Sequence, residues 1–147
     1  MKVSLIALML VIGFVLTLHL AMNGKVGSIL KNAEMGNAIF WTIGACTAII
    51  IGFTHWEPAV FTRLGEVPKW LLTAGVMGGA LVFGIAYAFP ILGPGRATVL
   101  MVSAQVISGL VFSHYGWFAE QADPISYTKI GGALLLLGGT ALVTFGK

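Results

Sequence analysis

The sequence predicts an all-α membrane protein with five transmembrane helices, and both its composition and its apolar stretches support this fold class. Of the 147 residues, 58% are hydrophobic and only 9% are charged, whereas about 25% of an ordinary soluble domain is charged. A soluble domain of this length buries only roughly 70% of its unfolded surface, so much of this apolar area would stay in water. The composition therefore excludes a soluble enzyme, a nucleic-acid-binding protein and a disordered chain.

Five apolar stretches approach the length of about 20 residues that a helix needs to cross a bilayer. They are residues 3–22, 36–54, 70–89, 97–115 and 127–145, and apart from Lys129 in the first turn of the last stretch they contain no Lys, Arg, Asp or Glu. A closed β-barrel would need segments of about 10 residues that alternate in polarity, and the four leucines at 134–137 do not alternate. We therefore expect one transmembrane domain over residues 1–147. The first stretch is longer than a signal-peptide core of about 7–15 residues, so we expect it to be retained as a helix.

Turn-forming and helix-breaking residues predict where these helices end. The Asn-Gly-Lys segment at 23–25 is a turn signal, which predicts that the first helix ends at Met22. After it, apolar residues at 26, 29, 30 and 33 lie opposite Lys31 and Glu34, and this pattern predicts a short amphipathic turn in the headgroup layer. Between the third and fourth helices, two prolines and two glycines should break the chain. These are Pro90, Gly93, Pro94 and Gly95.

The Lys and Arg residues divide equally between the two sides of the membrane if the chain crosses it five times. One side carries Lys2, Arg63, Lys69 and Lys129, and the other carries Lys25, Lys31, Arg96 and Lys147. Because an excess of Lys and Arg fixes orientation during insertion, an equal division predicts dual topology. Two inverted copies could then form an antiparallel homodimer with a solute site between them. An equal division of eight charges also arises by chance.

Small residues recur at helical spacing on several of the predicted helices. Because small side chains let helix backbones approach closely in lipid, we expect these residues to pack helices together, within the bundle or across a dimer. The helix-packing candidates are Gly44, Ala48, Gly52, Gly75, Gly79 and Ser108.

Polar and aromatic residues inside the spans are candidates for solute binding, because polar groups in the membrane are costly and therefore often functional. They are Gln105, Asn37, Trp41, His19, Asn23 and Tyr87. Each has a simpler interpretation: Asn and Gln side chains also link helices by hydrogen bonds, His19 and Asn23 can lie in the wet interface, and Trp41 and Tyr87 can face lipid. Gln105 lies deepest. With no acidic residue in any span, coupling to protons would depend on His19 or be absent.

No pattern of residues predicts catalysis or a cofactor. His19, His55 and His114 belong to different segments, and the lone cysteine, Cys46, excludes an internal disulfide. Intramembrane enzymes need an ionisable cluster or a nucleophile beside a base. We therefore expect neither an enzyme nor a bound metal or cofactor.

Short motifs along the whole chain resemble the YdcZ-like family of the bacterial drug/metabolite transporter superfamily, small five-helix inner-membrane proteins. The matching segments are His-Leu-Ala-Met-Asn-Gly at 19–24, Pro-Lys-Trp at 68–70, Gly-Val-Met-Gly-Gly at 75–79, Pro-Ile-Leu-Gly at 90–93, Ser-Ala-Gln at 103–105, His-Tyr-Gly at 114–116, Asp-Pro-Ile-Ser at 123–126 and Lys-Ile-Gly-Gly at 129–132. The polar positions carried over from the family are Asn23 and Gln105. The chain departs from it at His19, where the family often has Gln, and at Ser113, where it often has an acid.

The resemblance implies a half-size unit, because larger members of the superfamily resemble two five-helix halves fused in inverted orientation. Such a half would pair with itself as an inverted homodimer, or with a sister subunit of opposite orientation, in the bacterial inner membrane. The implied function is that of a secondary-transporter subunit that moves a small organic solute by alternating access. A non-transporting scaffold or assembly subunit of a larger complex is the alternative.

Overall fold

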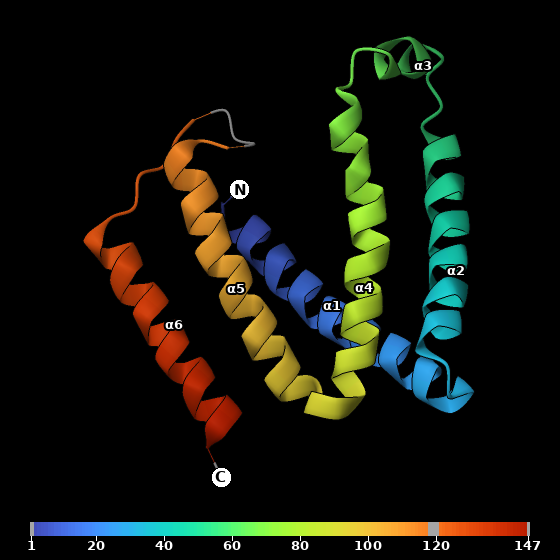
Figure 1. The fold of residues 1–147 in the computed structure, drawn as a ribbon. Helices are drawn as coiled ribbons and strands as arrows, with labels where there is room; N and C mark the ends of the chain where they lie inside the picture. Colours follow the sequence, from blue (N-terminus) through green and yellow to red (C-terminus); the bar gives the residue numbers. More distant parts are fainter. Residues whose placement is uncertain (1, 118–120, 147) are drawn as a thin grey trace. The chain divides into compact units, whose positions relative to one another are not determined.

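The computed structural model describes residues 2–117 and 121–146, and every regular element in this part of the chain is helical (Figure 1). Five of these helices are long and apolar enough to cross a membrane, as the sequence predicts. They are α1 (Lys2–Leu30), α2 (Ala33–Thr54), α4 (Thr73–Leu92), α5 (Pro94–Tyr115) and α6 (Tyr127–Phe145). The short helix α3 (Ala59–Leu64) and a single 3-10 turn, Lys69–Leu72, lie between α2 and α4. The chain forms two compact units, Met1–Ile91 and Leu92–Lys147.

The first helix is longer than expected, and the prediction that it ends at Met22 is wrong. Residues 23–25 continue α1, which reaches Leu30 and contains 29 residues. The amphipathic turn predicted after residue 25 is also wrong, because residues 26–30 belong to α1 and residues 33 and 34 belong to α2. Only two residues join the helices: Lys31 has a positive φ of 51°, and the Oδ1 atom of Asn32 accepts a hydrogen bond from the Met35 N–H at 2.8 Å. This side chain caps α2 and fixes the turn.

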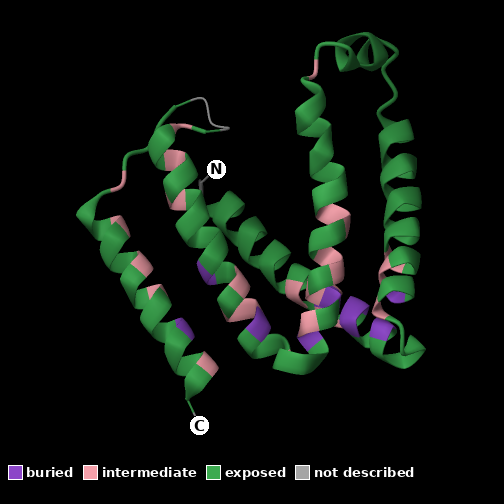
Figure 2. Ribbon diagram, in the orientation of Figure 1, coloured by how far each residue is buried: buried purple, intermediate pink, exposed green. Residues whose placement is uncertain are grey.

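The reason for the longer α1 is that its glycines serve close packing instead of a turn. A Cβ atom added at Gly36 of α2 would lie only 2.8 Å from the Cα atom of Gly27 in α1. A Cβ atom at Gly24 would lie 3.3 Å from the Cβ atom of Phe89 in α4. Figure 2 shows that the buried residues of the first unit gather where α1 meets α2 and α4. Backbones this close leave no room for larger residues.

The break between α4 and α5 is narrower than predicted. Pro90 lies inside α4, Pro94 begins α5, and Gly95 is part of α5, so of the four predicted breakers Gly93 alone lies between the helices, with a φ of 81°. Because Pro90 has no N–H, the carbonyl of Ala86 lacks its usual helical donor. This carbonyl oxygen would lie 3.4 Å from a Cβ atom at residue 24. The proline is tolerated where α1 covers the freed carbonyl.

The second unit is a hairpin of α5 and α6 that is held together by buried hydroxyl groups. Ser103 and Thr140 are 4% and 7% exposed, and their side-chain oxygens are hydrogen-bonded to each other. The Ser103 hydroxyl also donates to the Val99 carbonyl oxygen at 2.8 Å. Because a hydroxyl has a single proton, Thr140 must be the donor to Ser103. The contact therefore links the two helices and satisfies both hydroxyl groups.

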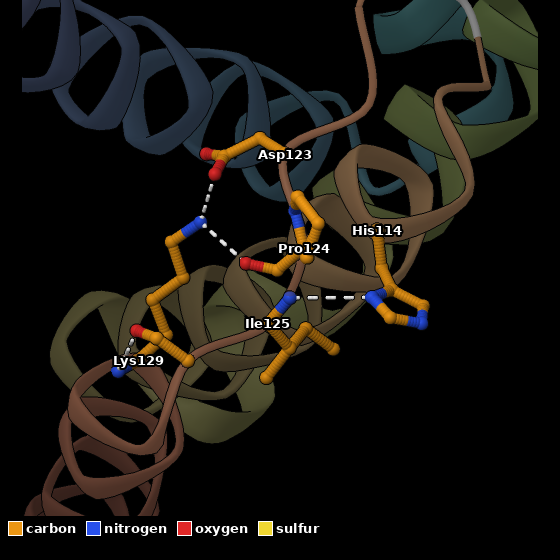
Figure 3. Close-up of polar contacts among 6 residues, drawn as sticks. His114, Asp123, Pro124, Ile125 and Lys129 are labelled. Atoms are coloured by element: carbon orange, nitrogen blue, oxygen red, sulfur yellow. Dashed lines mark hydrogen bonds and ion pairs between the residues drawn. The ribbon is translucent and has the colours of Figure 1, made fainter.

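The connection that leads into α6 is tied to both of its helices (Figure 3). The Ile125 N–H donates to Nδ1 of His114 at the end of α5, at 3.2 Å. From α6, Nζ of Lys129 donates to the Pro124 carbonyl oxygen at 3.1 Å and pairs with the carboxylate of Asp123. The side chain of Ser126 accepts from the Lys129 N–H and caps α6. These contacts explain why α6 begins at the residue that the sequence predicts.

We expect Gly36→Ala to lower the free energy of unfolding by about 1–3 kcal/mol, the usual cost of overpacking. The new Cβ atom would meet backbone atoms of Gly27, which cannot rotate away. Gly13→Ala in α1 is the control, because nothing lies within 4 Å of its added Cβ atom. Unfolding of both purified variants in a denaturant series, followed by circular dichroism, measures the difference. Equal stability of the two variants would contradict the close contact.

Candidate solute-binding cavity

A cavity of about 220 Å³ lies between α1 and α2. The lining residues are His19, Met22, Asn23 and Val26 from α1, and Gly36, Ile39, Phe40 and Ile43 from α2. Their spacing of three or four residues places them on one face of each helix. Drug-sized ligands usually occupy pockets of about 300–1,000 Å³, so this cavity suits a small solute or one part of a larger site.

Asn23 is the most unusual residue of the cavity. Its side chain is 2% exposed, and within the described residues neither Nδ2 nor Oδ1 has a hydrogen-bond partner. Leaving buried polar groups unpaired costs about 1–3 kcal/mol, and native structures do so rarely. The sequence predicts Asn23 as a solute-binding residue on the basis of its polarity alone. Its isolation among apolar side chains, which only the structure shows, gives that prediction a physical basis.

His19 lies one helical turn before Asn23 and contributes an aromatic wall. Its ring centroid is 4.6 Å from that of Phe40 in α2, and the two planes are tilted by 43°. The histidine is half-buried by this contact. It therefore packs against α2 and also lines the cavity. The sequence indicates that His19 and Asn23 share a helix face; Phe40 carries no polar signal, and sequence reasoning missed it.

Asn37 and Trp41, one turn apart on α2, contact α4. Nδ2 of Asn37 donates to the carbonyl oxygen of Gly79 at 3.3 Å, whereas its Oδ1 atom is buried without a partner in the described part of the chain. The Trp41 ring lies beside Gly78, where an added Cβ atom would be 3.6 Å from it. The amide of Asn37 thus links two helices, as one of the sequence interpretations has it. Solute binding by Asn37 and Trp41 stays a prediction.

Tyr87 lines another hollow of the first unit, and Gln105 belongs to the second unit. Tyr87 is 61% exposed and lines a second hollow of about 230 Å³ with Ser28, Lys31 and Asn32 at the end of α1. Gln105 is exposed on α5, in the second unit. The sequence groups these residues with Asn23 because polarity is visible in a sequence, whereas the helix that each side chain faces is not. Their binding of solute also stays a prediction.

Apart from Gly79, which is half-buried, the small residues predicted to pack helices are exposed in the structure. Nothing lies within 4 Å of a Cβ atom added at Gly44, Gly52, Gly75 or Gly79, and Ala48 and Ser108 are exposed. Of these residues, Gly79 contributes its carbonyl oxygen to the bond with Asn37. The close packing in the first unit instead uses Gly24, Gly27 and Gly36. Gly24 and Gly27 are three residues apart, a helical spacing that could have predicted their packing role. The turn predicted at residues 23–25 hid this signal. Helix packing by the exposed residues stays a prediction.

We expect Asn37→Leu to lower the free energy of unfolding by about 0.6–2 kcal/mol, the range measured for hydrogen bonds between membrane helices. The variant keeps the branching of the side chain but loses the bond from α2 to Gly79 of α4. Gln105→Leu is the matched control, because it replaces an exposed amide. Denaturant unfolding of the two purified variants tests the prediction, and an undiminished stability of Asn37→Leu would argue against the bridge.

Comparison with known proteins assigns the chain to a family. No solved structure matches it. The family described as "Putative inner membrane exporter, YdcZ" matches residues 4–142, nearly the whole chain. This match confirms the resemblance seen in the sequence motifs, and an exporter family indicates transport rather than catalysis. With five apolar helices of membrane-spanning length, the protein is a multi-pass inner-membrane protein, and it belongs to the YdcZ family of drug/metabolite transporter type.

Proposed function

We propose that this protein is a secondary-transporter subunit that moves a small organic solute across the inner membrane by alternating access between two inverted copies. The observation that carries the proposal is the amide of Asn23, which is buried in the α1–α2 cavity without a partner in the described residues. A group left unpaired at a cost to stability is explained when a ligand satisfies it. The exporter description of the family supports the same conclusion.

The place of the cavity along the helices suits the entry of a solute from one side. Lys25 and Lys31 follow Asn23 in the chain, and charged residues favour the edge of the hydrocarbon layer. Lys25 is two residues from Asn23, which is about 3 Å along a helix axis. The cavity would therefore begin near one membrane boundary, at Val26 and Gly36, and extend inward to His19 and Ile43.

An inverted second copy would place an identical cavity at the opposite boundary. The four Lys and Arg residues on each side remove any strong preference for one orientation. The exposed face of α2 with Gly44, Ala48 and Gly52 offers small residues on which another helix can pack closely. Rocking of one copy against the other would then open the two cavities in turn, as inverted repeats do in single-chain transporters. A sister subunit of opposite orientation would provide the same geometry.

We expect dual topology, and reporter fusions to Lys147 test it. One fusion carries a reporter that is active only in the periplasm, and the other carries a reporter that is active only in the cytoplasm. Activity of both reporters in cells is the expected outcome, because the charges do not favour either orientation. Activity of one reporter alone would overturn the inverted homodimer. The search would then turn to a sister subunit, or to the scaffold function if no small solute stabilises the purified protein.

We also expect the Gly44 face of α2 to form the contact between the two copies. In an antiparallel pair, residues near the middle of a helix meet their own counterparts, and Gly44 lies near the middle of α2 (Ala33–Thr54). Gly44→Cys, in a Cys46→Ser background, should form a disulfide-linked dimer in membranes treated with an oxidant. The native protein is the control, because Cys46 is exposed on the opposite side of the helix. Equal cross-linking through Cys46 would contradict this interface.

A further inference from the structure

We infer that the α1–α2 cavity selects an uncharged solute that carries a carboxamide or a similar donor–acceptor group on an apolar body. This inference rests on the proposed function and names its substrate class. Its basis is the pairing of a fully buried amide with walls that, apart from His19, are apolar, in one small cavity.

The chemistry of the solute's head group follows from the two side-chain atoms of Asn23 that have no hydrogen-bond partner in the described part of the chain. Its Nδ2 atom needs an acceptor and its Oδ1 atom needs a donor, and within the described residues neither has one. A carboxamide offers both on neighbouring atoms, so it can form two bonds with the same side chain. A carboxylate offers acceptors alone and a quaternary ammonium offers neither, so each would leave at least one atom of Asn23 unpaired.

The inference that the solute is uncharged follows from the residues that line the cavity. The residues that line the cavity include no Asp, Glu, Lys or Arg. A charge that enters such a site loses its hydration without gaining a counter-ion, which is far more costly than burial of a hydrogen-bonded neutral group. His19 is the one lining residue that can carry a charge, and a protonated ring would favour an anion. An anion is therefore the most informative competitor.

The inference that the rest of the solute is apolar follows from the other residues that line the cavity. Met22 and Val26 from α1 and Ile39, Phe40 and Ile43 from α2 provide aliphatic and aromatic surface. His19 and Phe40, whose ring centroids are 4.6 Å apart, both line the cavity and add aromatic surface. A volume of about 220 Å³ admits a single aromatic ring with its head group.

Three benzene derivatives of similar size test the inference: benzamide, benzoate and phenyltrimethylammonium. They share the phenyl ring; benzamide and benzoate are nearly isosteric and differ in charge and hydrogen bonding, and the trimethylammonium head group is also bulkier. Binding of each radiolabelled compound to the purified full-length protein in lipid nanodiscs is measured at equilibrium, because neutral benzamide crosses liposome membranes by itself. We expect affinity in the millimolar range for a fragment of this size. We expect benzamide to bind at least about tenfold more tightly than either ion.

Asn23→Leu assigns the binding to the cavity. Leucine has the same number and branching of side-chain heavy atoms as asparagine and lacks its polar atoms, so the variant should lose benzamide binding by about tenfold or more. Its melting temperature without ligand should be unchanged or higher, because an unpaired buried amide is removed. Thr47→Val is the control: Thr47 is exposed on α2, its hydroxyl donates to the Ile43 carbonyl oxygen in the same helix, and it does not line the cavity.

The outcomes separate this inference from the proposed function. Preference for benzoate or phenyltrimethylammonium, lost in Asn23→Leu, would overturn the uncharged class and leave the transporter proposal in place. A lower melting temperature and dissociation of the dimer in Asn23→Leu would show that the second copy satisfies the amide, which overturns the inference. Binding of no compound would also overturn it, whereas the transporter proposal is judged separately by the reporter fusions.

Discussion

The contact between Gly27 and Gly36 is the constraint on which the first unit depends. With the backbones of α1 and α2 so close that a Cβ atom would lie 2.8 Å from its neighbour, the two helices meet at this point and face each other beyond it. The same end of α1 meets α4 through Gly24, beside the carbonyl that Pro90 leaves without a donor. Small residues can bring helices together in lipid because association there depends on close packing rather than on exclusion of water.

Two asparagines near this meeting point differ in how the fold satisfies them. The amide nitrogen of Asn37 reaches a carbonyl of α4, so half of its hydrogen-bonding capacity supports the structure. Asn23 is buried more completely, and its side-chain amide has no hydrogen-bond partner in the described residues. A buried polar group without a partner costs about 1–3 kcal/mol. This difference separates a helix-bridging residue from a candidate binding residue of the same type.

Sequence reasoning succeeded and failed for identifiable reasons at particular residues. It placed α6 within its observed bounds because Ser126 caps the helix and the apolar run beyond it is unbroken. It ended α1 too early because Asn-Gly-Lys is a turn signal in isolation, whereas here Gly24 is selected by the contact with α4. It placed His19 and Asn23 together correctly because residues four apart share a face of one helix. It could not separate these two from Tyr87, which lines another hollow, or from Gln105, which is exposed on α5 of the second unit.

The sequence by itself determined the five membrane-length helices, because the hydropathy of about 20 consecutive residues is a local property that needs no knowledge of packing. It also determined the equal distribution of Lys and Arg about those helices. The tertiary structure alone decided which polar groups are satisfied and which are not. The bond from Asn37 to Gly79 spans 42 residues of sequence, and the isolation of Asn23 depends on which side chains of α1 and α2 surround it. Such relations depend on distances between helices, which no local pattern encodes.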